Sequence, residues 1–305
     1  MIQRFLPFLT LAVMFLGLCF DPNFRTATNL SSVIRQTAVI NIMALGMTMI
    51  IITGGIDLSV GAILAMGGLL GTMAMSKGVS IPVAILIGIL AGAAWGFVNG
   101  FLTTRLKINS FIVTLGTLGI IRGLTLVVSN GLPVHEIPSG FSFLGEGTVL
   151  FVPFVLWILL GCAVIVHFIL EHTKLGRYSF AIGSNPDAAF YAGIPVAFHT
   201  TAVYAICGAL TGLAGMIEAS RLMTGQPTAG QGYELQAIAA VVIGGGSLRG
   251  GEGSVIGTLV GAFIMGLLAN GSDLLGVSPY WQQVIIGAII ILAVSVDELR
   301  KRKAV

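Results

Sequence analysis

Residues 51–61 read IITGGIDLSVG and place one aspartate, Asp57, between two strongly apolar segments. Residues 36–53 before it and residues 58–75 after it contain no charged side chain. A charged side chain at membrane depth costs roughly 2.5–3.5 kcal/mol on insertion scales, so it usually faces a polar pathway or another helix. The neighbouring glycines let the backbone leave helical geometry here. The stretch therefore predicts a charged break in a membrane hairpin, a feature from which a transporter can build a path.

The composition places the whole chain among membrane proteins. Of its 305 residues, 56% are hydrophobic and 9% are charged, whereas soluble domains carry about 25% charged residues. The 42 glycines favour close packing of helices in so apolar a chain. The basic residues are too few and too dispersed to form a nucleic-acid-binding surface. We therefore expect an all-α integral membrane protein with a single transmembrane domain over residues 1–305.

The apolar runs predict the number and direction of the membrane spans. A helix that crosses a bilayer needs about 20 apolar residues. About ten spans are predicted, at residues 5–20, 36–53, 58–76, 81–104, 111–128, 150–170, 200–219, 234–247, 254–270 and 281–297. With a cytoplasmic N-terminus, this order puts ten of the 15 Lys and Arg residues on the cytoplasmic face. Because cytoplasmic loops carry the excess of Lys and Arg, both termini are expected in the cytoplasm.

Glycines recur every fourth residue in two stretches, at Gly88, Gly92, Gly96 and Gly100, and at Gly253, Gly257 and Gly261. This spacing lets two backbones approach closely, either inside one subunit or at a subunit interface or pore. Two stretches, 49–68 and 240–261, also share a GG break between apolar residues and a glycine-spaced helix. Their likeness is either an internal repeat, as transporters often contain, or a similarity of composition.

The longest polar interruption on the predicted cytoplasmic face is residues 171–199, EHTKLGRYSFAIGSNPDAAFYAGIPVAFH. Asn185 suits the N-cap of a helix, and Pro186 suits its first turn. Residues 187–193 then form a short helix with small residues on one side, which Gly193 ends. Such a helix either docks into a groove on a partner protein or lies as an ordinary interfacial helix.

A second polar cluster, EASRLMTGQPTAGQGYELQAIA, covers residues 218–239 near the predicted outer face. Glu218 and Arg221 are three residues apart, so they share a helix face and can neutralise each other. The polar side chains that follow are Gln226, Gln231, Tyr233, Glu234 and Gln236, among Gly225, Pro227, Gly230 and Gly232. Irregular backbone at membrane depth occurs only inside protein or beside a wet cavity. The cluster is either a contact for hydroxyl-rich solutes or an outer loop with a structural Glu–Arg pair.

Sequence patterns for catalysis and metal binding are missing. No lysine follows a glycine, so the phosphate-binding pattern GxxxxGK[ST] does not occur. The patterns HExxH and GxSxG do not occur either. The spacing of Cys19, Cys162 and Cys207 fits neither a metal site nor a disulfide framework. The sequence predicts no enzyme and no metal site, and it excludes a P-loop ATPase.

Several long motifs resemble a known family. They lie at residues 35–61, 106–125, 173–194, 218–262 and 276–294, and include NSFIVTLGTLGIIRGLT, GSNPDAAFYAGI and GGGSLRGGEGSVIGTLVGA. The chain is similar over nearly its whole length to the membrane permease subunits of bacterial ATP-driven (ABC) monosaccharide importers, most of all to those for ribose. The resemblance implies the ABC importer permease fold and a multi-pass location in the bacterial inner (cytoplasmic) membrane.

The resemblance also implies partners. A second permease copy, identical or similar, would complete the pathway, and a periplasmic or lipid-anchored binding protein would deliver the monosaccharide. A cytoplasmic ATPase would bind ATP and Mg²⁺, so this chain needs no cofactor of its own. In such importers a short cytoplasmic helix rich in Ala and Gly docks on the ATPase. The positions that fit this coupling helix are Asn185, Asp187, Ala188, Ala189, Gly193 and Ile194.

The expected mechanism is alternating access through a central cavity. The candidate pathway residues are Asn41, Asp57, Ser59, Gln226, Glu234 and Gln236. Their contacts with the sugar would be weak, since strong binding in the permease slows release. Asp57 has an alternative structural role as the N-cap of a helix that starts at Leu58. The rival function is a stand-alone secondary sugar transporter or channel with Asp57 in a proton relay, which would have no need of a docking helix.

Overall fold

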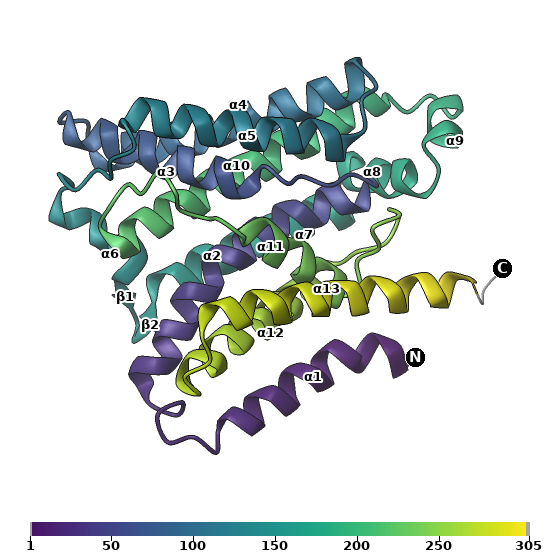
Figure 1. Cartoon of the computed structure of the whole chain (residues 1–305). Coiled ribbons are helices and arrows are strands. Elements are labelled where there is room, and N and C mark those ends of the chain that lie inside the picture. The colour runs from purple at the N-terminus through teal and green to yellow at the C-terminus, as the bar shows by residue number, and fades with distance from the viewer. Residues whose placement is uncertain (1, 303–305) are drawn as a thin grey trace.

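The computed structural model describes residues 2–302 and is a bundle of helices (Figure 1). A helix occupies each predicted span. These helices are α1 (Ile2–Leu18), α2 (Ala27–Ile52), α3 (Val60–Ser76), α4 (Ile81–Arg105), α5 (Ser110–Ser129), α7 (Phe154–His172), α10 (Val196–Leu222), α11 (Tyr233–Ile243), α12 (Val255–Leu274) and α13 (Pro279–Arg302). The structure therefore confirms an all-α membrane class, with one small hairpin as its only sheet in the described residues.

Six of the described helices are long and apolar enough to cross a membrane, namely α2, α4, α5, α7, α10 and α12. The other four contain shorter apolar stretches. Helix α11 is the shortest of them, with 11 residues, about 16 Å at 1.5 Å per residue. The crossing number of ten stays a prediction.

Residues 148–153 depart from the predicted helix at 150–170. They form a hairpin of β1 (Thr148–Val149) and β2 (Val152–Pro153), and α7 begins only at Phe154. The two turn residues, Leu150 and Phe151, have positive φ angles of 52° and 63°, which a helix cannot contain. A short apolar run fits a strand as well as a helix, so periodicity alone could not separate the two.

Glycines bring the central helices into backbone contact. A Cβ added at Gly92 would meet the carbonyl oxygen of Gly208, and one added at Gly96 would meet that of Tyr204. Helices α4 and α10 therefore pack without side chains between them, as small-residue faces allow. Likewise, a Cβ at Gly261 on α12 would meet the carbonyl oxygen of Ala240 on α11. The glycine stripes thus pack inside one subunit, the first of the two alternatives considered from the sequence.

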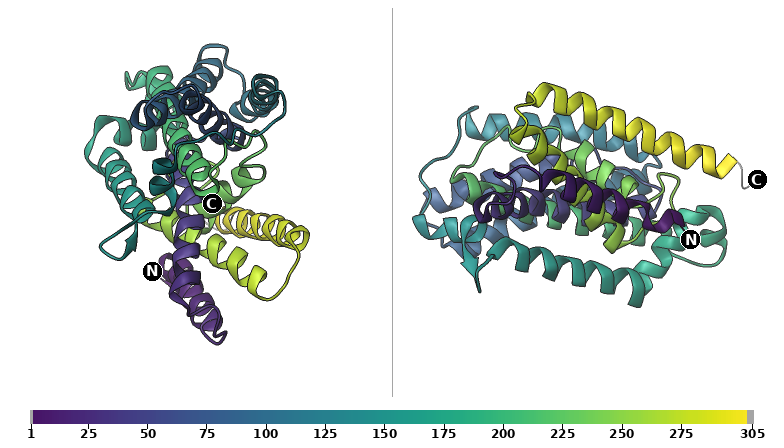
Figure 2. Two further views of the ribbon diagram at one scale, coloured as in Figure 1. Left: turned by 90° about the vertical axis from the view of Figure 1, so that its left-hand side faces the viewer. Right: turned by 90° about the horizontal axis from the view of Figure 1, so that it is seen from below.

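Helix α2 runs through the middle of the bundle. Every residue from 37 to 52 is buried, and the contacts of α2 include α7, α10, α11 and α12. Helix α13 lies at an edge of the bundle in both views of Figure 2, and α1 lies at the lower edge in its left view. The core of the molecule therefore surrounds α2 and α10.

Opposite ends of the bundle carry different connecting segments. Helices α8 (Lys174–Ser184) and α9 (Pro186–Tyr191) lie at the end where α1 begins and α13 ends (Figures 1 and 2). The hairpin, a 3₁₀ turn at Ser139–Phe141 and α6 (Ser142–Glu146) lie at the opposite end (Figure 1). The start of α1 and the end of α13 thus lie at the same end of the bundle as α8 and α9.

Candidate functional site

A fully buried polar cluster surrounds Asp57 in the loop between α2 and α3. The Ser59 backbone N–H and hydroxyl donate to Asp57 Oδ1 at 2.8 Å and 2.6 Å. The Asn99 amide of α4 donates to Asp57 Oδ2 at 3.2 Å and to Ser59 Oγ at 2.8 Å. All three residues have 0% exposure. The carboxylate is thus satisfied by neutral donors, and no basic side chain among the described residues pairs with it.

The Asp57 carboxylate stabilises a turn that precedes α3. Helix α3 begins at Val60, two residues later than Leu58, and its N-cap is Ser59. Because Asp57 accepts the N–H of the residue two positions ahead, it closes an Asx turn. The structural role of Asp57 is therefore to fix the chain just before the helix, in place of the N-cap position considered from the sequence.

Other helices hold the backbone of Ile56, next to Asp57. The Ile56 N–H donates to Ser110 Oγ at 3.2 Å, and its carbonyl oxygen accepts from Thr114 Oγ1 and Tyr204 Oη, both at 3.3 Å. Tyr204 has 0% exposure. The polar groups of the break are therefore satisfied inside protein, as irregular backbone at membrane depth requires.

Asn41 belongs to a different place on α2. Its amide donates to the carbonyl oxygen of Thr37 at 3.1 Å. Its side-chain oxygen is buried without a hydrogen-bond partner among the described residues. The amide that donates to Asp57 is that of Asn99, and not that of the candidate pathway residue Asn41.

The predicted Glu218–Arg221 ion pair is present at the C-terminal end of α10. Two guanidinium nitrogens of Arg221 donate to the two Glu218 oxygens at 2.9 Å and 3.2 Å. Tyr233, in the first turn of α11, donates its hydroxyl to Glu218 at 3.3 Å. The pair is largely buried and ties the end of α10 to the start of α11.

Arg122 of α5 holds the irregular segment 223–232 in place. Its Nη1 donates to the carbonyl oxygens of Pro227 and Ala229 at 2.8 Å and 2.9 Å. Its Nη2 donates to the carbonyl oxygen of Gly61 at 3.3 Å. Since Gly61 lies in the first turn of α3, one guanidinium joins segment 223–232 to the helix that follows Asp57.

Glu234 approaches the same turn of α3. Its Oε1 accepts from the Gly232 N–H at 3.2 Å, and a Cβ added at Gly61 would meet its Oε2. Gln236, further along α11, is half-buried. Glu234 of α11 therefore approaches the first turn of α3 at Gly61, whereas Asp57 binds Ser59 and Asn99.

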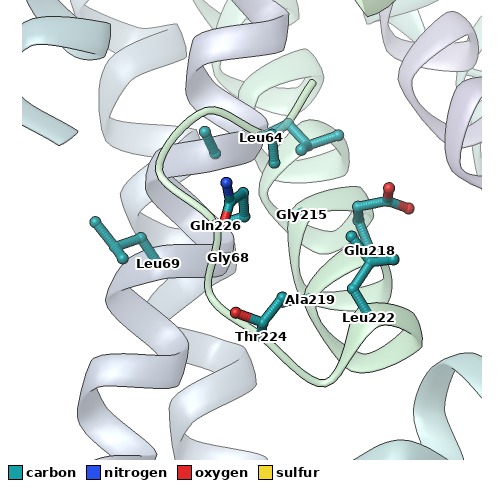
Figure 3. Close-up of a pocket in the computed structure, with 11 residues that line it drawn as sticks. Leu64, Gly68, Leu69, Gly215, Glu218, Ala219, Leu222, Thr224 and Gln226 are labelled. Carbon is teal, nitrogen blue, oxygen red and sulfur yellow. The ribbon is translucent and has the colours of Figure 1, made fainter. Parts of the chain in front are cut away.

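Figure 3 shows a small cavity between α3, the end of α10 and segment 223–232. Its lining includes Leu64, Gly68, Glu218, Thr224 and Gln226. The free volume of this cavity is about 10 Å³, far below the roughly 300–1,000 Å³ of typical small-molecule sites. Of the six candidate pathway residues, only Gln226 lines this cavity.

Helix α9 has the boundaries that its capping residues dictate. Asn185 Oδ1 accepts from the Ala188 N–H at 2.9 Å, and Pro186 opens the helix. The helix ends at Tyr191, earlier than the predicted residue 193, because the chain turns at Gly193, where φ is 81°. The Ile194 N–H returns to the carbonyl oxygen of Ala189 at 3.1 Å.

The two faces of α9 differ in exposure. Ala189 is buried against the bundle, whereas Phe190 and Tyr191 are 66% and 87% exposed. Asp187 and Ala188 are exposed as well. Large aromatic side chains on an exposed turn are typical anchors of a protein interface.

The sequence reasoning did not select Asn99, Arg122 or Tyr204. Asn99 and Arg122 each stand in a predicted span that is otherwise almost free of large polar groups, at 81–104 and 111–128. That isolation was an available signal for a functional or structural role. Tyr204 gave no such signal, because its position beside Ile56 depends on how α10 packs.

Comparisons with known proteins cover most of the chain. A family model described as the branched-chain amino acid transport system permease component matches residues 29–294. The ribose import permease of Escherichia coli (strain K12) is 45% identical over 285 residues, which are 92% of this chain and 89% of that protein. The ribose import permease of Bacillus subtilis (strain 168) is 43% identical over 305 residues, 99% of this chain and 94% of that protein.

A relative named for another sugar is also similar. The D-allose transport system permease of Escherichia coli (strain K12) is 39% identical over 277 residues, covering 90% of this chain and 85% of that protein. No solved structure gives a significant match to this chain.

Proposed function

The chain belongs to the permease family whose model matches residues 29–294, as a permease subunit of an ATP-driven sugar importer, and we propose that it carries ribose or a closely related monosaccharide by alternating access. The observation that carries the choice of sugar is the identity of 45% to a ribose import permease over 92% of the chain. Relatives named for allose and arabinose share less identity, at 39% and 37%.

The ATPase activity lies in a separate subunit. We propose that this ATPase binds ATP and Mg²⁺ and docks on α9. The exposed rings of Phe190 and Tyr191 supply apolar anchors, and the buried Ala189 holds the helix against the bundle. Aromatic residues at the centre of an interface contribute most of the binding energy. A second permease copy and a sugar-binding protein on the opposite face complete the assembly.

The pathway itself is proposed to pass the cluster of Asp57, Ser59 and Asn99. When the helices separate, the hydroxyl, amide and carboxylate groups of this cluster can break the hydrogen bonds between them and form hydrogen bonds with sugar hydroxyls. Gln226, Glu234 and Gln236 would serve the sugar nearer the outer end. Each contact would be weak, because a solute must leave the permease as easily as it enters.

The protein is a multi-pass membrane protein. We propose the bacterial inner membrane as its location, with both termini and α9 in the cytoplasm. This orientation places ten Lys and Arg residues on the cytoplasmic side under the ten-span topology. It also places α9 where an ATPase can reach it.

The test is ribose uptake into proteoliposomes that contain the permease and its ATPase, with the binding protein on the outer side. Uptake is expected only with ATP inside and with the binding protein present. An ATPase with its P-loop lysine replaced is the control and should abolish uptake. Uptake that follows a pH gradient without ATP would instead establish a secondary transporter. Calorimetry of the binding protein with ribose, allose and arabinose then identifies the sugar.

A further inference from the structure

Three backbones meet without side chains at the end of the bundle that carries α8 and α9. Gly183, near the C-terminal end of α8, faces the last residue of α2, and a Cβ added there would meet the carbonyl oxygen of Ile52. The same Cβ would contact the backbone nitrogen of Gly251. The Gly251 N–H donates to the Ile52 carbonyl oxygen at 2.9 Å. Helix α8, helix α2 and the loop before α12 are therefore in direct backbone contact.

Gly250 belongs to the same contact and lies against both Gly183 and Gly54. Its φ angle is 88°, a conformation that favours glycine. A Cβ added at Gly250 would lie 2.9 Å from Gly183 Cα and 2.9 Å from the Gly54 nitrogen. The loop of residues 249–251 thus fills the space between α8 and the chain that leaves α2.

The contact connects two sites that are otherwise apart. On one side, Gly183 precedes Asn185, whose side chain caps α9. On the other side, Gly54 precedes Asp57, whose carboxylate binds Ser59 and Asn99. The intervening Ile56 is held by three hydrogen bonds, two from α5 and one from α10. A displacement of α8 would therefore move the backbone of residues 52–56 directly, since no side-chain rotamer stands between them to absorb it.

We propose that Gly183, Gly250 and Gly251 form a joint that couples docking at α9 to the position of the Asp57 loop. The name "glycine joint" below denotes these three residues. The inference rests on the proposed function, in which α9 receives the ATPase and Asp57 lies on the pathway. The inference adds a mechanical link between the break at Gly54–Gly55 and the break at Gly250–Gly251. It also states that the small size of Gly183 is required for coupling and not for docking.

The first test is Gly183→Ala in the complete complex of permease, ATPase and binding protein. The added methyl group is expected to leave co-purification of the ATPase intact, because α9 is unchanged. Stimulation of ATP hydrolysis by the ribose-loaded binding protein is expected to fall at least tenfold, with more ATP hydrolysed per ribose moved. Gly161→Ala on α7 is the matched control, since a Cβ there meets nothing within 4 Å. Wild-type coupling in Gly183→Ala would overturn the proposal.

Hydrogen exchange of the wild-type complex tests whether the joint moves, and it remains informative when Gly183→Ala fails to assemble. Addition of ATP and the ribose-loaded binding protein should change exchange in residues 52–56 and 249–251 together with α8, while exchange around Gly161 of α7 stays unchanged. A change confined to α8 contradicts a moving joint. Failure of the wild-type complex to use ATP would instead refute the proposed function.

Discussion

The Asn99 amide donates a hydrogen bond to the Asp57 carboxylate at 3.2 Å, across 42 positions of sequence. It joins the loop after α2 to α4, and both side chains are fully buried. The bond contributes to stability because a buried carboxylate oxygen that loses its donor is left unpaired, and its desolvation free energy is no longer offset. The relationship gives the first two predictions.

Asn99→Ala should destabilise the permease by about 1–3 kcal/mol, because it removes the donors to Asp57 Oδ2 and Ser59 Oγ. The measurement is the thermal unfolding midpoint of the purified chain in detergent. Thr103→Ala, one turn further along α4, is the control, since its buried hydroxyl has no hydrogen-bond partner among the described residues. An equal loss of stability in both variants would show that helix packing, and not the bond to Asp57, decides the result.

Asp57→Asn should lower ribose uptake at least tenfold while the protein still inserts in the membrane. The asparagine oxygen can accept the two bonds from Ser59, but its amide group then faces the amide of Asn99. The double variant Asp57→Asn/Asn99→Asp restores a donor–acceptor pair between the two positions and should recover part of the unfolding midpoint, since a carboxylate at position 99 cannot donate to Ser59 Oγ. Uptake should stay low if the carboxylate at position 57 serves the pathway. Recovery of both properties would leave Asp57 with a structural role alone.

Local chemistry in the sequence was sufficient to predict the helices and several of their ends. Apolar runs of about 20 residues located every long helix, and the order Asn185, Pro186, Gly193 located α9 with its N-cap. The spacing of Glu218 and Arg221 predicted their ion pair. Each of these features depends on residues close together in the chain.

Contacts between distant segments could not be predicted in the same way. Asn99 meets Asp57 through the packing of α4 on other helices, and Arg122 meets three carbonyl oxygens of other segments. A single sequence contains no signal for such pairings. Helix α11 stops at Ile243, before the predicted residue 247, because the chain turns at Gly245, where φ is 92°, and the Gly246 N–H returns to the carbonyl oxygen of Val241 at 2.8 Å.

Arg122→Ala should release the segment of residues 223–232. The guanidinium donates to Pro227, Ala229 and Gly61, and each bond from a charged donor contributes about 1.5–3 kcal/mol. Hydrogen exchange should become at least tenfold faster in this segment and stay unchanged in α7. Arg122→Lys should restore only part of the protection, because an ammonium group lacks the planar fork. Arg105→Ala, at an exposed position in the last turn of α4, is the control. Unchanged exchange in Arg122→Ala would remove Arg122 from any role in holding the segment.

Tyr191→Ala should weaken binding of the ATPase about 30-fold, since truncation of an interface anchor typically costs 2 kcal/mol or more. Phe198→Ala is a matched aromatic control, because Phe198 is 69% exposed on α10, outside α9.

Ala189→Glu places a charge at a position that is 4% exposed, and Gly193→Glu puts a side chain where φ is 81°. Both should displace α9 and abolish transport, with insertion of the permease retained. The measurement is co-purification of the ATPase with each tagged variant, followed by titration of the purified partners. Normal recovery of the ATPase with Ala189→Glu and Gly193→Glu would place the docking surface elsewhere on the molecule.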